Sequence, residues 1–169
     1  AAWTPSEAMK FTFGKMPNPL VLDNHVMDSD YTPEGFGFNY TRALGEKHTF
    51  GMNLGAIVVG ESSGDSSDAY AGLAQVTLDS KLSTKLTSHI GVATYSIINK
   101  EAAQESHYNR GNTATYSAGD RGNQILSYNY NPVIVDAALT YNLDGFPMWE
   151  GSFPVKFGGT YINNPAVSE

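Results

Sequence analysis

Seven stretches of this sequence alternate apolar residues with small or polar ones at a period of two, and convincing helical periodicity is absent between them. In one of them, Phe50, Met52 and Leu54 alternate with two glycines and an asparagine. Such alternation is typical of β-strands whose two faces meet different surroundings. The stretches are Met9–Phe13, Phe36–Thr41, Thr49–Val58, Tyr70–Asp79, Lys85–Ile98, Val133–Leu143 and Phe153–Tyr161. The pattern predicts an all-β, antiparallel fold of about seven strands in a single unit spanning residues 1–169.

The stretch Lys85–Ile98 is the least regular of the seven. Leu86, Ile90 and Val92 share one parity, whereas Tyr95 and Ile97 fall on the other. We predict a strand here, although the alternation does not assign its apolar residues to one face.

The residues that alternate with the apolar ones are mostly Gly, Thr, Asn, Ser and Gln, and charged residues make up only 16% of the chain. A soluble barrel has an apolar interior and a charged exterior, whereas a membrane barrel has an apolar exterior and a polar lumen. The scarcity of charge favours an antiparallel transmembrane β-barrel. A soluble, lipocalin-like, ligand-binding barrel is the alternative.

The predicted connections alternate in length. Residues 15–35 and 99–132 form long segments, and Gly60–Asp68 is a polar loop, whereas Leu44–His48 and Leu78–Ser83 are short. Membrane barrels have short turns at one end and long loops at the other. The connections therefore support the same prediction.

Composition excludes several kinds of function. The net charge of −7 argues against a nucleic-acid partner, which requires clustered Lys and Arg. Cysteine is absent, and the four histidines have no metal-ligand spacing, so we predict neither a metal site nor a cofactor. Gly60–Gly64 fits the hydrolase pattern G-x-S-x-G around Ser62, but a strand follows where that motif requires a helix. We predict no catalytic residue and no enzyme activity.

Two motifs then point to a family. The sequence FGKMPNP, Phe13–Pro19, ends a predicted strand, and DSDYTPEG, Asp28–Gly35, leads into the next one. Together they resemble a family of porins from the outer membranes of Gram-negative bacteria, in which a strand ends in Gly-Lys/Arg-Met-x-Asn-Pro and the next begins after Asp-x-Asp-x-Thr-Pro-Glu-Gly. The resemblance covers about 27 residues, Gly14–Tyr40.

The resemblance implies a passive outer-membrane channel for small hydrophilic solutes or ions, in contact with outer-membrane lipid and often a homo-trimer. A barrel of 16 strands at this spacing needs roughly 390 residues, so we expect these 169 residues to be part of a longer porin. A small closed outer-membrane barrel with a structural or adhesive role is the competing hypothesis, because the lumen of eight strands is filled by side chains.

Charged residues supply the candidates for a constriction or a pore lining. Asp23, Asp28, Asp30 and Glu34 lie in the segment 15–35, and Lys85, Asp136 and Lys156 lie in or beside predicted strands. Carboxylates on a loop that bends into a lumen favour cations, and the net charge of −7 predicts the same weak preference. The alternatives are a solvated surface loop or a calcium site at Asp28 and Asp30.

Overall fold

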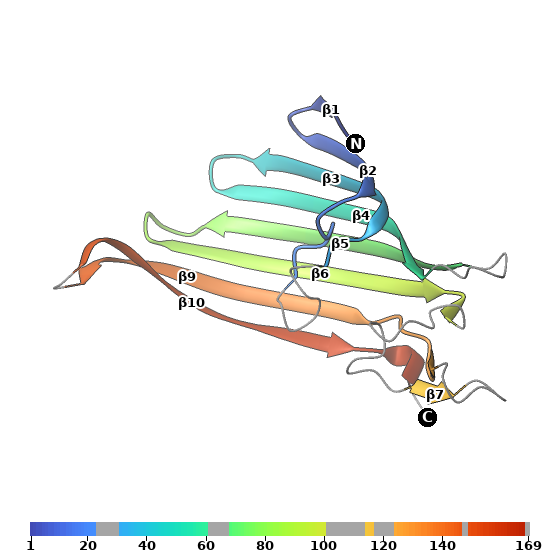
Figure 1. Ribbon diagram of the computed structural model, residues 1–169. Helices are drawn as coiled ribbons and strands as arrows, with labels where there is room; N and C mark the ends of the chain where they lie inside the picture. The colour runs from blue at the N-terminus through green and yellow to red at the C-terminus, as the bar shows by residue number, and fades with distance from the viewer. Residues whose placement is uncertain (23–30, 61–67, 101–113, 117–123, 147–148, 168–169) are drawn as a thin grey trace.

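The computed structural model describes residues 1–22, 31–60, 68–100, 114–116, 124–146 and 149–167, and Figure 1 shows one broad antiparallel sheet. Its eight strands are β1 (Ala2–Ser6), β2 (Met9–Lys15), β3 (Glu34–Leu44), β4 (His48–Gly60), β5 (Ala69–Lys81), β6 (Leu86–Ile98), β9 (Val133–Phe146) and β10 (Trp149–Asn163). They pair in this order, and β7 (Ala114–Tyr116) and β8 (Gln124–Leu126) form a separate hairpin. A 3-10 turn follows at Pro165–Val167.

The prediction of an all-β antiparallel fold is confirmed, and each of the seven predicted strands is present. The sequence did not predict β1, which has only five residues and contains Pro5. It also did not predict β7 and β8, which lie inside the expected long loop and have three residues each. Strands this short do not complete enough periods for alternation to be recognised.

The main sheet is open. Each strand pairs with its successor in the order above, and β1 and β10 form the two edges. From β5 to β6 the pairing runs without a register shift from Tyr70 opposite Ile98 to Lys81 opposite Thr87. Among the described residues, β1 and β10 do not pair with each other.

Connections of different length lie at opposite ends of the strands, as predicted (Figure 1). Short turns join β3 to β4 and β5 to β6 at one end, where Gly45 adopts a φ of +72° that suits glycine. The connections of residues 16–33, 61–68 and 99–132 all leave from the other end. This consistency follows from the antiparallel order, because every second connection returns to the same end.

The two faces of the sheet differ in chemistry. One face, called the apolar face, carries Phe38, Met52, Val76 and Ile90 in successive strands, and the opposite one, the amide face, carries the amides of Asn39, Asn53 and Gln75. Val76 is 44% exposed and Ile90 is 50% exposed although both lie on central strands. By contrast, Gln75 is only 2% exposed. The apolar face thus leaves large side chains uncovered on central strands, whereas the opposite face buries an amide.

The buried core lies on the amide face, beneath a segment that folds back after β2. Met16 and Leu20 of this segment pack with a cluster from β4 and β5 that comprises Ile57, Val59, Ala69, Ala71 and Leu73. We call Met16–Leu22 the covering segment. No helix among the described residues is long and apolar enough to cross a membrane.

The covering segment explains the irregular pattern of β6. Tyr95 and Ile97 lie on the amide face and pack, partly buried, against the core under the covering segment, as does Leu22. Ile90 and Val92 lie on the apolar face of the same strand. Both faces of β6 therefore need apolar residues near the loop end, which obscures the alternation in the sequence.

Candidate functional site

The covering segment lies directly against glycines of the amide face. Added at Gly37, a Cβ atom would lie 2.8 Å from the Met16 sulfur, and at Gly55 it would lie 3.0 Å from Cγ of Pro19. Real Cβ atoms rarely approach other atoms so closely. The two glycines are paired across β3 and β4, so they form a shallow depression that the covering segment fills.

A row of amides holds the covering segment by hydrogen bonds. Asn39, Asn53 and Gln75 face one another in register across β3, β4 and β5. Asn39 Nδ2 donates to Asn53 Oδ1 at 2.8 Å, and Asn53 Nδ2 donates to Gln75 Oε1 at 2.9 Å. Gln75 also pairs with the backbone of Val21, accepting from its N–H at 2.8 Å and donating to its carbonyl at 2.6 Å.

This pairing satisfies the polar groups that the covering segment buries. Gln75 makes the two contacts that a neighbouring β-strand would offer to Val21, and Asn39 donates to the carbonyl of Pro19 at 3.4 Å. Buried polar groups without such partners are costly. The amide row therefore binds the backbone of the covering segment and holds it against the sheet.

Gly35 allows the chain to return from the segment into β3. Its φ is +150°, and a Cβ atom there would meet the carbonyl oxygen of Ala56 on β4. Only glycine accepts both conditions without strain. The backbone of Pro33 closes the excursion by accepting a hydrogen bond from Met16 N–H at 2.9 Å.

A charged cluster lies on the same face, on β5, β6 and β9. His89 Nδ1 lies 2.7 Å from a carboxylate oxygen of Asp79, and its Nε2 lies 2.8 Å from a carboxylate oxygen of Asp136. The second carboxylate oxygen of Asp136 is buried over Gly91, where a Cβ atom would collide with it, and it has no hydrogen-bond partner in the described part of the protein.

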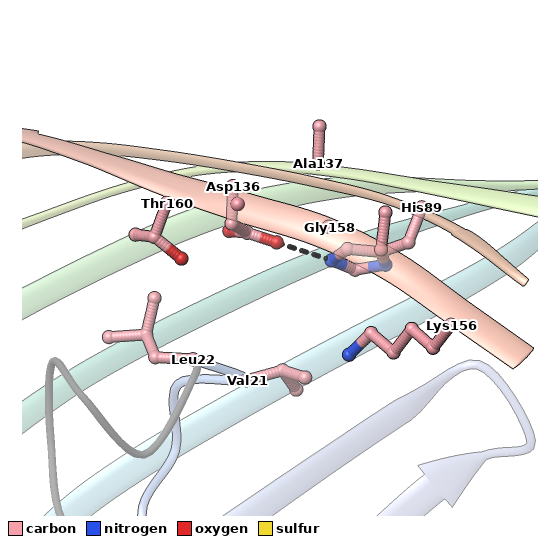
Figure 2. Close-up of a pocket in the computed structure, with 10 residues that line it drawn as sticks. Val21, Leu22, His89, Asp136, Ala137, Lys156, Gly158 and Thr160 are labelled. Carbon is pink, nitrogen blue, oxygen red and sulfur yellow. Dashed lines mark ion pairs between the residues drawn. The ribbon is translucent and has the colours of Figure 1, made fainter.

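A cavity of about 380 Å³ separates this cluster from the covering segment. Figure 2 shows Val21 and Leu22 on one side and His89, Asp136 and Lys156 on the other, with the Lys156 amino group reaching toward Val21. Lys156 has no ion-pair partner among the described residues, because the ion pairs found there involve Lys85 and His89. The cavity therefore has an apolar side and a charged side.

The structure brings together two of the seven predicted site residues. Asp136 and Lys156 both line the cavity. Glu34 begins β3 opposite Lys15 and shares the parity of the apolar face, away from the cavity. The predictions for Asp23, Asp28 and Asp30, including the calcium alternative, fall outside the described residues.

Lys85 lies at the turn end of the sheet, immediately before β6. Its amino group forms an ion pair with Asp144 near the end of β9. The hydrogen bond that Lys85 donates to this carboxylate, followed by the carboxylate's negative charge, raises the pKa of Lys85 above the ordinary value. The pair links the start of β6 to β9 at the turn end of the strands, far from the covering segment.

Sequence reasoning did not identify the amide row as a site. Asn39, Asn53 and Gln75 appeared in the sequence only as the polar partners of apolar residues. The useful signal was their combination with Gly37 and Gly55 two residues away, because small residues and amides on one parity leave room and hydrogen bonds for extended backbone. The geometry also brings His89 and Asp79 together with the predicted Asp136.

Comparison of the chain with protein-family models, with curated proteins and with solved structures finds no match. Among the described residues no group of three or more His, Asp or Glu side chains is arranged to hold a metal ion.

Proposed function

We propose that this chain forms part of the wall of an outer-membrane porin, a passive aqueous channel for small hydrophilic solutes or ions with a weak cation preference. The observation that carries the proposal is the inverted burial on the central strands. Val76 and Ile90 are about half exposed on the apolar face, whereas Gln75 is buried beneath the chain's own covering segment. A wall between lipid and an aqueous lumen has this distribution, and a soluble barrel has the reverse.

The covering segment gives the proposed channel a constriction. It lies on the amide face, which faces the lumen in this proposal, and the pair of hydrogen bonds between Gln75 and Val21 fixes its position. A backbone segment in the lumen narrows the path for solutes. The cavity between the segment and Lys156 is then part of that path.

The open sheet and the connections fit the same proposal. In the part of the chain that the structure describes, β1 and β10 each pair with one neighbouring strand only, and a membrane barrel has no such open edge. We propose that further strands complete the wall and that lipid covers the apolar face. A homo-trimer is part of the proposal because porins of the resembling family often form one.

The excess of carboxylates over the whole chain is the basis for proposing a weak cation preference. Asp79 and Asp136 are opposed by His89 and Lys156, so the face is nearly balanced at the cavity. The chain as a whole carries a net charge of −7. Because charges along a pore raise the local concentration of the opposite ion, a modest excess of carboxylates gives a modest preference.

Two adjacent residues of β10 provide the sharpest test. Lys156 lines the cavity on the amide face, and its neighbour Phe157 is 81% exposed on the apolar face. These 169 residues contain no cysteine, so Lys156→Cys and Phe157→Cys each introduce the one reactive thiol of this part of the wall. Each variant of the native polypeptide is extracted in detergent, weighed by intact mass spectrometry and inserted into planar bilayers.

We expect stepwise conductance in both variants. A charged, water-soluble thiosulfonate should change the conductance of Lys156→Cys and leave Phe157→Cys unchanged. A fluorophore on Phe157→Cys should be quenched by brominated lipid, and one on Lys156→Cys should not. Lipid quenching without conductance would favour the closed binding barrel, and a folded protein that needs no detergent would favour the soluble one.

A further inference from the structure

His89 has a carboxylate at each ring nitrogen, with Asp79 at 2.7 Å from Nδ1 and Asp136 at 2.8 Å from Nε2. An imidazole ring donates from both nitrogens only when it is the charged imidazolium. In the neutral ring one nitrogen is an acceptor and faces a carboxylate without a hydrogen bond. The charged ring therefore donates a hydrogen bond to both carboxylates, whereas the neutral ring donates to only one of them.

The charges around His89 come from three strands. Asp79 belongs to β5, Asp136 to β9, and Lys156 reaches the cavity from β10. On its own strand the nearest residues on the same face are Thr87 and Gly91, and the covering segment Met16–Leu22 contains no titratable side chain. Lys81 of β5 also lies on this face, opposite Thr87, but does not line the cavity. His89, Asp79, Asp136 and Lys156 sum to zero with a charged ring and to −1 with a neutral ring. Loss of the proton therefore adds one negative charge at the cavity whether or not Lys81 is counted.

We propose that His89 is a specificity-determining residue of the channel: loss of its proton to solvent increases the preference for cations over anions. The inference rests on the porin function proposed above. The His89 side chain is 25% exposed beside the cavity, so solvent protons reach it and its charge acts on solutes there. Histidine is the side chain that ordinarily changes charge between about pH 5 and 8.

The expected effect is moderate. One unit charge about 8 Å from an ion in water changes the local concentrations of cations and anions about twofold each, in opposite directions. The cation-to-anion permeability ratio should therefore rise about two- to fivefold as the ring becomes neutral. Added salt should reduce this change because it screens charges in the aqueous path.

The test measures reversal potentials of the native polypeptide in planar bilayers under a KCl gradient, at intervals from pH 5 to pH 9. His89→Gln replaces the ring by an uncharged amide and so removes the ring's charge at every pH. We expect the wild type to become more cation-selective as the pH rises and His89→Gln to be cation-selective throughout. His48→Gln is the matched control, because His48 bonds to Ser80 at 2.8 Å on the opposite face; it should behave like the wild type.

Asp136→Asn supplies a second test that retains the histidine. It should lower the cation preference at every pH while the pH dependence remains. If His89→Gln does not fold, His89→Asn, which also replaces the ring by an uncharged amide, takes its place in the same measurement.

The outcomes separate the two proposals. Absence of conductance from folded wild-type protein at every pH would refute the channel itself. A conducting channel whose pH dependence survives in His89→Gln, or that shows none in the wild type, would refute the role of His89 and leave the channel intact.

Discussion

The amide face contains two regions that differ in polarity: one presents neutral amides beneath the covering segment, and the other presents charged side chains beside the cavity. Under the covering segment, β3, β4 and β5 present Gly37, Asn53 and Gln75, whereas β6, β9 and β10 present charged residues beside an open cavity. An amide can be buried at little cost when each polar atom finds a partner, whereas a buried charge is costly even when it is paired. The difference teaches that the first region holds backbone in place, whereas the charges of the second remain beside open space, where solutes would pass in the proposed channel.

Gly35→Ala should destabilise the region beneath the covering segment more than any other substitution proposed. The added methyl group meets the Ala56 carbonyl, and the φ of +150° strains any residue other than glycine. We expect a loss of about 3 kcal/mol or more in the free energy of unfolding, from strain of this kind plus the collision. Urea unfolding in lipid vesicles, followed by tryptophan fluorescence, measures it.

Gly72→Ala is the matched control for that variant. Gly72 lies on β5, and a Cβ atom added there meets no atom within 4 Å. Its unfolding free energy should stay within about 0.5 kcal/mol of the wild type. Equal losses in the two variants would show that the approach of β3 to β4 at Gly35 is not the limiting contact.

Gln75→Leu should release the covering segment while leaving the sheet intact. It removes both hydrogen bonds to Val21 and leaves Asn53 without its acceptor. Unsatisfied buried groups of this kind cost about 1–3 kcal/mol each, so we expect a loss of about 2–3 kcal/mol in the free energy of unfolding. Single-channel conductance should rise, because the segment no longer narrows the lumen.

Limited proteolysis gives an independent measure of the release. The segment Met16–Leu22 should become sensitive to protease in Gln75→Leu and remain resistant in Ser96→Ala, a change at an exposed site on the apolar face of β6. A Gln75→Leu protein with wild-type conductance and unchanged protease resistance would show that apolar packing of Met16 and Leu20 alone holds the segment.

The sequence predicted the main strands of the sheet because the alternation of apolar and polar residues is a local property of each strand. It predicted all seven long strands, and even β6 despite Tyr95 and Ile97. It did not predict the covering segment's position, since contacts such as Val21 with Gln75 join residues 54 positions apart and leave no local pattern. For the same reason it identified Asp136 and Lys156 as charged strand residues without placing them together.

Lys156→Gln should change the ion preference of the channel without changing the stability of the protein. Lys156 lines the cavity and has no ion-pair partner among the described residues, so its removal leaves no buried charge unpaired. We expect an unfolding free energy within about 0.5 kcal/mol of the wild type. The cation-to-anion permeability ratio should rise about two- to fivefold at neutral pH, as for one unit charge near an ion in water.

Reversal potentials under a KCl gradient measure that ratio. Lys10→Gln is the control and should have a smaller effect, because Lys10 has the amide-face parity of β2, four strands away from β6 and next to the edge strand β1. If the cation-to-anion permeability ratio of Lys156→Gln equals that of the wild type, ions do not pass through the cavity.

Lys85→Met should have the smallest effect, although Lys85 makes a close ion pair with Asp144. Both side chains are exposed, at 42% and 72%, and exposed pairs contribute little because water and salt screen them. The pKa of Lys85 is raised by this partner, so the contribution is fully present below the ordinary lysine value and is lost only as the pH rises through the raised one. Wild type and Lys85→Met should therefore melt together from pH 6 to pH 9, as followed by circular dichroism, and also share the same ion preference. A clear loss of stability in the variant over that range would mean that the turn end, and not only the covered region, limits unfolding of the sheet.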